Sequence, residues 1–155
     1  ICKKKSKFLN NEKVIKNILE REKNLGLSNI ITIKKFYSRI SKLKLNTMKL
    51  LKKISQQNKK ILGYGASTKG NVLLQYYDID KNNIEYIADR NPYKFGKYTP
   101  GTKIKIISEK QARKIKPDYF FVLPWHFKKE ILMRESKIRK QGTKMIFPLP
   151  NLKII

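Results

Sequence analysis

The sequence predicts an α/β fold, in which a Rossmann-like, mostly parallel sheet with flanking helices is preceded by an N-terminal helical arm. From residue 60 onward, short runs rich in β-branched and aromatic residues alternate with helical patterns, as in βαβ units. Before residue 60, apolar residues recur every three or four positions, which is the spacing of amphipathic helices. We therefore expect a helical arm or linker over residues 1–59 and a Rossmann-like domain over residues 60–155.

The arm is predicted to contain two helices. Asn11 is placed to cap the first, which runs to about Lys23, and Gly26 follows where a C-terminal cap belongs. Ser28 or Thr32 is expected to start the second helix. Its apolar stripe is typical of core packing, although a membrane-surface or RNA-binding helix shows the same pattern. The stripe consists of Ile33, Phe36, Tyr37, Ile40, Leu43, Thr47, Leu50, Leu51 and Ile54.

The domain is predicted to alternate five strands with three helices. Ser108 and Gln111 form a capping-box pair before one helix, and Gly142 lies just past the last one. We expect strands over residues 60–64, 84–88, 103–107, 119–123 and 144–147, and helices over 69–77, 109–114 and 127–140.

The composition narrows the function classes. The 155 residues are 40% hydrophobic and 31% charged, which is enough for a packed core. There is no run of about 18 apolar residues and no charged-then-apolar leader, so we expect a cytoplasmic protein without a membrane-spanning segment. Cys2 and His126 are the single cysteine and histidine, which argues against a disulfide framework and a metal site. Because Ile1 rather than methionine comes first, we expect a piece of a longer protein.

The net charge of +26 points to a polyanionic partner such as a nucleic acid. However, 31 lysines accompany only six arginines, whereas base and phosphate forks favour arginine. The 21 isoleucines share A/T-rich codons with lysine, so genome bias is favoured over selection for nucleic-acid binding as the explanation of the composition. The positive charge is also spread along the chain. We therefore expect nucleic acid to bind only non-specifically.

A glycine-rich segment connects the first predicted strand of the domain to a helix. Backbone N–H groups in such a turn approach a phosphate closely at the positive end of the helix dipole. The third glycine stands at position 70 rather than at the 68 of the dinucleotide fingerprint, and the spacing is not that of a P-loop. Phosphate binding is favoured over a turn needed only for strand–helix packing. The segment is Gly63, Tyr64, Gly65, Ala66, Ser67, Thr68, Lys69, Gly70 and Asn71.

The second predicted strand leads to Asp89. An acidic residue at this place holds a ribose hydroxyl in dinucleotide folds, but Asp89 is equally suited to capping the loop that follows it. That loop is aromatic, basic and glycine-containing. Beside a phosphate site it is suited to stacking on a base or a sugar, and otherwise it is a surface loop. Its candidate residues are Asn91, Pro92, Lys94 and Tyr98.

The fourth predicted strand leads to Pro124, Trp125 and His126 at its carboxyl end, where open α/β sheets bind ligands. His126 is the one side chain here that titrates near neutral pH, which makes it a weak candidate for catalysis. A structural hydrogen-bonding role is the stronger alternative. The carboxylates are few and scattered along the chain, so no acid–base pair is expected.

Taken in order, these segments resemble the C-terminal domain of the S-adenosylmethionine-dependent C-methyltransferase family. Members of that family include enzymes that methylate a ring carbon of nucleotide-linked deoxysugars. The resemblance covers about residues 12–155. It rests on the segments 63–71, 89–101, 117–119, 123–126 and 147–150, the last of which reads Phe-Pro-Leu-Pro.

Proteins of this family have a zinc-binding domain, a central domain for S-adenosylmethionine and a Rossmann-like C-terminal domain that closes over the nucleotide-sugar. The resemblance implies that this chain binds a nucleotide-linked sugar and works with an upstream methyltransferase domain, in cis or in trans. The base and the methyl-donor site then lie mainly in the central domain, so we expect no cofactor on this chain and no methyl transfer by it alone. The implied substrate-binding residues are Gly63, Tyr64, Gly65, Ala66, Ser67, Thr68, Lys69, Gly70, Asn71, Asp89, Asn91, Pro92, Lys94, Tyr98, Pro124, Trp125 and His126.

Two other readings stay open. One is a free-standing nucleotide-binding or NAD(P)-binding Rossmann module, which the displaced third glycine disfavours. The other is a basic nucleic-acid-binding protein, for which the sequence shows neither an aromatic RNA platform nor a recognisable reading helix.

Overall fold

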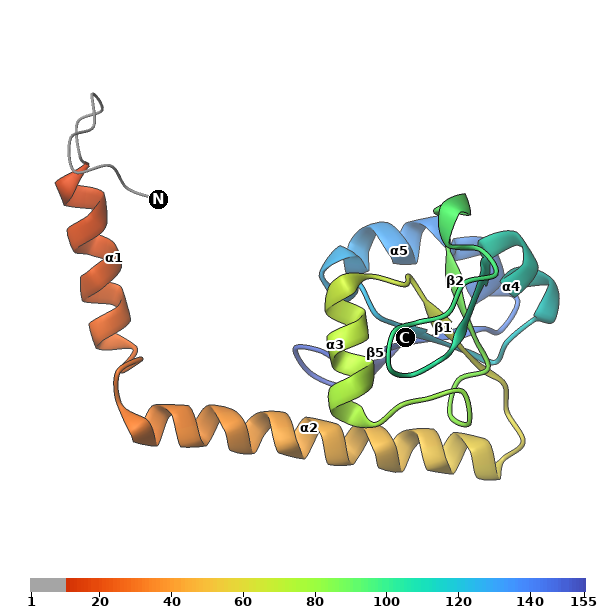
Figure 1. The fold of residues 1–155 in the computed structure, drawn as a ribbon, viewed down its shortest axis with the longest axis horizontal. Helices are drawn as coiled ribbons and strands as arrows, with labels where there is room; N and C mark the ends of the chain where they lie inside the picture. The colour runs from red at the N-terminus through yellow and green to blue at the C-terminus, as the bar shows by residue number, and fades with distance from the viewer. Residues whose placement is uncertain (1–10) are drawn as a thin grey trace. The chain divides into compact units, whose positions relative to one another are not determined.

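The computed structural model describes residues 11–155, and Cys2 lies outside the described residues (Figure 1). The chain divides into two compact units, residues 1–40 and 41–155. The division falls between Ile40 and Ser41, inside the second helix, and the boundary expected between residues 59 and 60 stays a prediction. The second unit therefore takes in the C-terminal half of the second helix, because that half contributes to its core.

The first unit contains α1 (Glu12–Asn24) and the beginning of α2 (Ile30–Gln56). Asn11 caps α1 as predicted, since its side chain accepts a hydrogen bond from the backbone N–H of Val14 at 3.3 Å. The start of α2 was predicted incorrectly. Asn29, not Ser28 or Thr32, precedes the helix and accepts a hydrogen bond from the Ile31 N–H at 2.8 Å.

The apolar stripe of α2 behaves differently along its length. Thr47, Leu51 and Ile54 are buried, as core packing requires. Phe36 and Tyr37, near the start of the helix, are 51% and 65% exposed, so the core-packing prediction is wrong for that end.

The second unit is built on a six-stranded sheet of order β3-β2-β1-β4-β5-β6. All neighbouring strands are parallel except β5 and β6, which are antiparallel. This is the strand order of dinucleotide-binding folds, and it confirms the predicted fold class. The short β6 was not predicted. The strands are β1 (Ile61–Tyr64), β2 (Tyr86–Asp89), β3 (Lys105–Ser108), β4 (Tyr119–Val122), β5 (Lys144–Phe147) and β6 (Lys153–Ile154).

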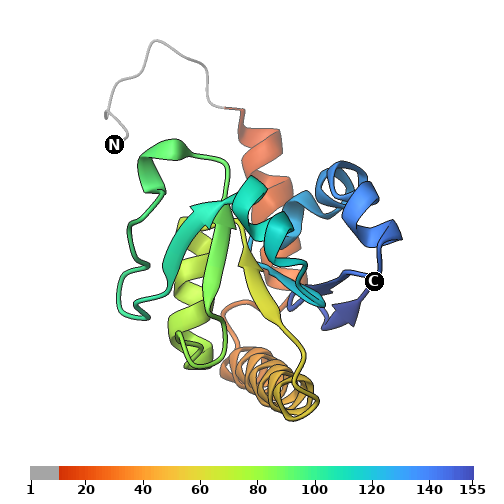
Figure 2. The ribbon, with the colours of Figure 1, turned by 90° about the vertical axis from the view of Figure 1, so that its right-hand side faces the viewer.

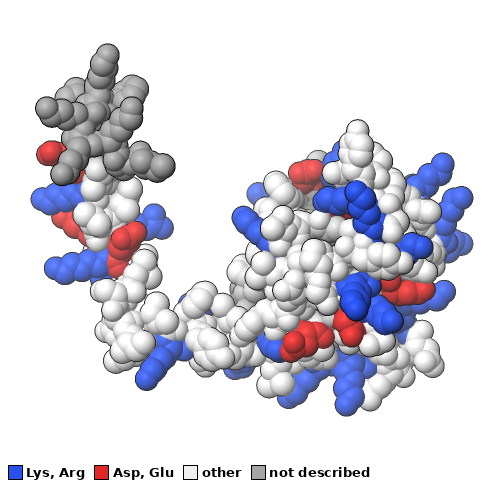
Figure 3. All heavy atoms as spheres, viewed as in Figure 1, with Lys and Arg blue, Asp and Glu red and all other residues white. Residues whose placement is uncertain are grey.

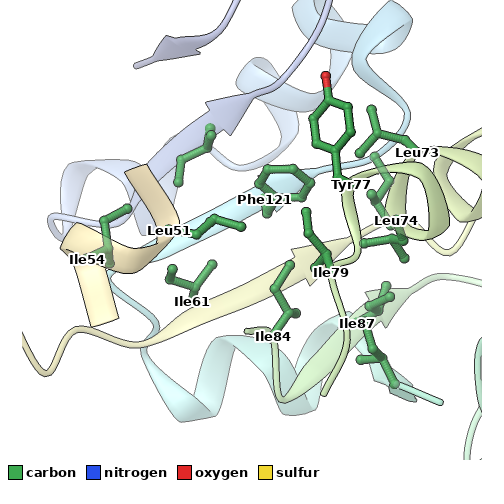
Figure 4. Close-up of a cluster of buried hydrophobic side chains, with 13 residues drawn as sticks. Leu51, Ile54, Ile61, Leu73, Leu74, Tyr77, Ile79, Ile84, Ile87 and Phe121 are labelled. Atoms are coloured by element: carbon green, nitrogen blue, oxygen red, sulfur yellow. The ribbon is translucent and has the colours of Figure 1, made fainter. Parts of the chain in front are cut away.

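Helices cover both faces of the sheet (Figure 2). On one face, α2 and α3 (Thr68–Tyr77) pack on strand residues such as Ile61 and Phe121 (Figure 4). On the other, α4 (Glu109–Ile115), α5 (Lys128–Arg134) and α6 (Ser136–Lys140) pack on Leu62 and Phe120. Successive strand residues therefore point into the hydrophobic clusters on opposite faces of the sheet, because side chains alternate along a strand. Each fully buried Ile, Leu or Phe stabilises the fold by about 1.5–3 kcal/mol.

The helix predicted over residues 127–140 is divided in the structure. A 3-10 turn (Trp125–Phe127) leads into α5, and the backbone leaves helical geometry at Glu135 before α6. The side chain of Glu135 is 1% exposed and enters a cluster of charged groups described below. The capping box of Ser108 and Gln111 forms as predicted at the start of α4.

Candidate functional site

The site lies where the strand order reverses. β1 pairs with β2 on one side and with β4 on the other, so their carboxyl ends open a crevice of the kind that binds ligands in open α/β sheets. Two cavities occupy this edge. The first, here called the ionic cavity, has a volume of about 280 Å³ and is lined by Asp89, Arg90, Lys94, Glu109, Glu130 and Arg134, with Tyr64, Gly65, Ser67, Pro124, Phe127 and Ile131.

The second, here called the apolar cavity, has a volume of about 230 Å³. The two cavities share Ser67 and Lys94, so they meet at the start of α3. The apolar cavity is lined by Leu74, Pro100, Ile106 and Leu123, with Ala66, Ser67, Thr68, Asn71, Lys94 and Thr99.

Gly65 turns the chain out of β1. It has a φ of +81°, and a Cβ atom at this position would lie 2.6 Å from Pro124 Cγ. Both facts require glycine here. Gly63 and Gly70 serve packing instead, because Cβ atoms there would lie 2.6 Å from the Ile87 side chain and 2.5 Å from the Leu123 side chain. Gly63 and Gly70 therefore fit the alternative in which the glycines are needed for strand–helix packing, whereas Gly65 is needed for the turn itself.

The first turn of α3 offers free donors. Ser67 caps the helix, since its hydroxyl accepts a hydrogen bond from the Gly70 N–H at 3.0 Å, and its carbonyl accepts one from Asn71. Among residues 11–155, the backbone N–H groups of Thr68 and Lys69 have no hydrogen-bond partner. Two N–H groups at the positive end of a helix favour an anion.

Asp89 is fully engaged by its own chain. One carboxylate oxygen accepts a hydrogen bond from the Asn91 N–H, and the other accepts from the Ala66 N–H, both at 2.8 Å. The Lys94 ammonium lies 3.3 Å from the same carboxylate. These contacts match the loop-capping alternative, and they leave the 11% exposed side chain little capacity for a ribose hydroxyl.

Lys94 is the cation that belongs to both cavities. Its ammonium donates to the Ala66 carbonyl at 2.8 Å as well as contacting Asp89. Its position follows from a 3-10 turn (Pro92–Lys94), which Asn91 caps by accepting a hydrogen bond from the Tyr93 N–H. Asn91 and Pro92 thus shape the loop that carries Lys94.

A cluster of charged groups supports the floor of the ionic cavity. The Tyr64 hydroxyl lies 2.7 Å from a Glu135 oxygen and 2.9 Å from a Glu109 oxygen, and it accepts hydrogen bonds from Arg134 Nε and Nη2. Arg113 forms ion pairs with both Glu109 and Glu135. The cluster connects the end of β1 to α4 and α5, and it holds the Arg134 guanidinium at the cavity wall.

Burial and hydrogen bonding shift the titration of this cluster. Burial, followed by the hydrogen bond with Glu135, raises the pKa of Tyr64, which keeps its hydroxyl protonated. Burial alone would raise the pKa of Glu135 too, but hydrogen bonds from Arg113 and Tyr64 outweigh it, and the pKa lies below its ordinary value. The folded state therefore favours the ionised Glu135.

Trp125 and His126 lie beside the site without lining either cavity. Trp125 packs on both core clusters, which gives it a structural role. His126 lies between Trp125 and Phe127, with ring centroids 5.7 Å and 4.4 Å away. No hydrogen bond from a described residue orients its imidazole, although a general base would need such a partner.

The structure gathers about half of the predicted binding residues at the two cavities. Those that line a cavity are Tyr64, Gly65, Ala66, Ser67, Thr68, Asn71, Asp89, Lys94 and Pro124. Those that do not are Gly63, Lys69, Gly70, Asn91, Pro92, Tyr98, Trp125 and His126.

Sequence reasoning missed the wall of the ionic cavity opposite the turn. The carboxylates looked scattered along the sequence, yet Glu109, Glu130 and Glu135 converge around Arg134. The spacing of Glu130 and Arg134, and of Glu109 and Arg113, four residues apart on helices, was the available signal.

The described residues meet the requirements of neither a metal site nor a membrane-spanning helix, and the face drawn in Figure 3 has no basic stripe for nucleic acid. Within residues 11–155, no three His, Cys, Asp or Glu side chains are placed to hold a metal ion. No helix in that range is long and apolar enough to cross a membrane. Basic side chains are spread over the face of the second unit that Figure 3 shows, rather than gathered in one stripe.

The fold is Rossmann-like, and the two cavities lie where the strand order reverses. Comparison with known families is more specific, because a family model for the C-methyltransferase C-terminal domain matches residues 1–150. The chain therefore belongs to the C-methyltransferase C-terminal domain family. It is also 30% identical over 141 residues to the C-methyltransferase NovU of Streptomyces niveus. That match covers 91% of this chain and 34% of the relative, so the chain spans about a third of the protein it resembles.

Proposed function

We propose that this chain is the acceptor-binding part of an S-adenosylmethionine-dependent C-methyltransferase that acts on a nucleotide-linked sugar. Membership of the family supports a role in methyl transfer. The pair of adjoining cavities supports the binding of an extended, two-ended ligand.

The observation that carries the proposal is the junction of the two cavities. There, Ser67 and Lys94 line both cavities, and the first turn of α3, in which the N–H groups of Thr68 and Lys69 are free, follows directly on Ser67. Backbone donors at a helix N-terminus together with an ammonium group match the oxygens of a diphosphate. A nucleotide-linked sugar has its diphosphate in the middle and a base and a sugar at its ends.

We expect the methyl donor to bind to another part of the enzyme rather than to this chain. In many nucleoside sites an acidic residue after the second strand accepts hydrogen bonds from the ribose. Here the equivalent Asp89 is occupied by Ala66, Asn91 and Lys94, so the residues present do not fit an adenosyl ribose. We therefore expect this chain to need an upstream methyltransferase domain, in cis or in trans, and to transfer no methyl group alone.

This chain and the methyl-donor domain therefore have different roles in the proposed reaction. S-Adenosylmethionine supplies an electrophilic methyl group on its own domain. The residues of this chain bind the diphosphate and orient the sugar, so that the ring carbon to be methylated faces the partner domain. Holding the two reactants in a fixed geometry is a large part of catalysis for a two-substrate transfer.

Calorimetric titration of the chain at moderate salt tests the proposal. We expect saturable binding of a thymidine-diphosphate sugar, and no saturable binding of NAD or of a short RNA. Tight NAD binding would favour a dinucleotide module, and RNA binding that resists salt would favour a nucleic-acid function. Either result, or no binding of the diphosphate sugar, would contradict the proposal.

Two lysine variants refine the same titration. The family resemblance implies that Lys69 binds the substrate, whereas the structure places Lys94 in both cavities and Lys69 in neither. We therefore expect Lys94→Met to weaken binding about tenfold and Lys69→Met about threefold or less, because one charge-assisted hydrogen bond is worth about a factor of ten. If Lys69→Met weakened binding more than Lys94→Met does, the phosphate would lie nearer to Lys69 than to Lys94.

A further inference from the structure

The two cavities differ in the chemistry of their walls. The ionic cavity has six charged side chains, three acidic and three basic. The apolar cavity has one, Lys94, and its walls come mainly from Leu74, Pro100, Ile106 and Leu123. The two ends of a nucleotide-linked sugar also differ, because a base is a flat ring with a largely apolar face and a sugar is ringed by hydroxyls.

Neither cavity is large enough for the whole ligand. Pockets for drug-sized molecules typically measure about 300–1,000 Å³. The ionic cavity measures about 280 Å³ and the apolar cavity about 230 Å³. A nucleotide-linked sugar must therefore occupy both, and it must cross between them where Ser67 and Lys94 line each one.

The ionic cavity presents a fixed pair of hydrogen-bonding groups. Arg134 donates to the Tyr64 hydroxyl from Nε at 3.1 Å and from Nη2 at 2.8 Å, which holds its guanidinium plane. Its third nitrogen, Nη1, donates to Glu130 at 3.1 Å. A guanidinium beside a carboxylate supplies donors and acceptors side by side, as neighbouring sugar hydroxyls require. The Glu130 side chain is 61% exposed, so one of its oxygens is available to a ligand.

The balance of charge in this cavity argues for a neutral ligand group. The chain carries a net charge of +26, yet the ionic cavity pairs Asp89, Glu109 and Glu130 with Arg90, Lys94 and Arg134. A phosphate gains little from a wall whose charges cancel. A hydroxyl-rich, uncharged ring gains hydrogen bonds from both signs of charge.

The apolar cavity suits the base. Its aliphatic walls match a planar ring, and Asn71 adds an amide at the edge. The Asn71 Oδ1 atom is buried and has no hydrogen-bond partner among the described residues. An unpaired amide is available to turn toward the polar edge of a base.

We infer that the ionic cavity holds the sugar and the apolar cavity holds the base, with Glu130 and Arg134 as the residues that recognise the sugar. This assignment rests on the proposed function, since it presumes a nucleotide-linked sugar as ligand. It fixes the direction of the ligand across the sheet edge, from α3 and the loop before β3 on the base side to α5 on the sugar side.

Titrations with a truncated ligand test the assignment. Thymidine-diphosphate glucose carries a hexose where thymidine diphosphate ends in a free phosphate, so a residue that contacts the sugar weakens the binding of the glucose conjugate and not that of thymidine diphosphate. We expect Glu130→Gln to weaken the glucose conjugate about five- to tenfold and to change thymidine diphosphate by less than about twofold. We expect Asn71→Ala to weaken both ligands by the same factor. Glu85→Gln is the matched control, because it removes the same charge at an exposed position outside both cavities.

Each outcome separates the assignment from the proposed function. If Glu130→Gln weakens both ligands equally, or leaves the glucose conjugate unchanged, the sugar does not lie in the ionic cavity. If Asn71→Ala weakens only the conjugate, the ligand runs in the opposite direction. If the unaltered chain binds neither ligand, the proposed function itself fails.

Discussion

At the scale of single residues, the backbone of Gly65, in the turn after β1, packs closely against Pro124, which follows β4. The backbone of Gly65 is left-handed, and Pro124 occupies the space that any Cβ would need. Gly96 has a similar φ of +77°, but a Cβ atom added there would have no atom within 4 Å apart from those of its neighbours in the chain. The two glycines therefore separate the cost of the backbone conformation from the cost of the clash.

Gly65→Ala is predicted to destabilise the protein more than Gly96→Ala. An alanine in the left-handed region costs about 1–2 kcal/mol, which both variants incur. At Gly65 the contact with Pro124 adds about 1–3 kcal/mol, as overpacking does in a filled site. Urea unfolding followed by circular dichroism measures both free energies. Equal losses in the two variants would show that Pro124 moves aside without cost.

Individual residues also show where sequence reasoning reached its limit. The glycine-rich turn was visible because glycine and the Ser-Thr-Lys run stand next to each other in the chain. The sequence also predicted that Asp89 lies beside that turn. It did not show that Asp89 contacts Ala66, 23 residues away in the chain, and Lys94, 5 residues away. A single sequence carries no record of which of two roles such a carboxylate fills.

At the scale of elements, the ionic cluster connects β1, α4 and α5 through Tyr64, Glu109, Arg113, Arg134 and Glu135. Glu135 is its most buried member, with a side chain that is 1% exposed. Breaking a buried ion pair by neutralising one partner is strongly destabilising, because the remaining charges lose their compensation. The cluster therefore makes the packing of α4 and α5 sensitive to pH.

Acidification is predicted to destabilise the protein through Glu135. Because its pKa is lower in the folded state, the ionised carboxylate contributes stability above its unfolded pKa of about 4.3. That contribution is lost as the pH falls from about 4.3 through the lower folded pKa. Glu135→Gln is expected to cost about 3–5 kcal/mol at pH 7 and progressively less below pH 4.

Urea unfolding at a series of pH values measures this difference, and Glu85→Gln serves as the control at an exposed carboxylate. A constant gap between wild type and Glu135→Gln from pH 7 to pH 3 would mean that Glu135 is not ionised in the folded protein. A gap that widens on acidification would reverse the sign of the argument.

Most elements of the second unit were predictable to within about two residues, because β-branched runs and capping signals are local. Two features were not. The break at Glu135 accompanies a buried carboxylate, and β6 has only two residues. Each of them is set by tertiary contacts rather than by local pattern.

The whole molecule combines a high positive charge with a locally balanced site. The net charge of +26 is spread over the chain, and the charges lining the ionic cavity cancel. Family membership was recognisable from sequence because several motifs occur in order along the chain, and the family model confirms it. The opposite wall of the site was not recognisable, since its residues come from α4 and α5 and meet only in the fold.

The central claim is that the turn between β1 and α3 binds the diphosphate of a nucleotide-linked sugar. Amide chemical shifts of the isotopically labelled chain, followed during titration with a thymidine-diphosphate sugar, test it most directly. The account predicts that the largest saturable changes fall on the Thr68 and Lys69 amides, whose N–H groups are free, and on residues around Lys94. Saturable changes confined to other parts of the chain, or none at all, would contradict it.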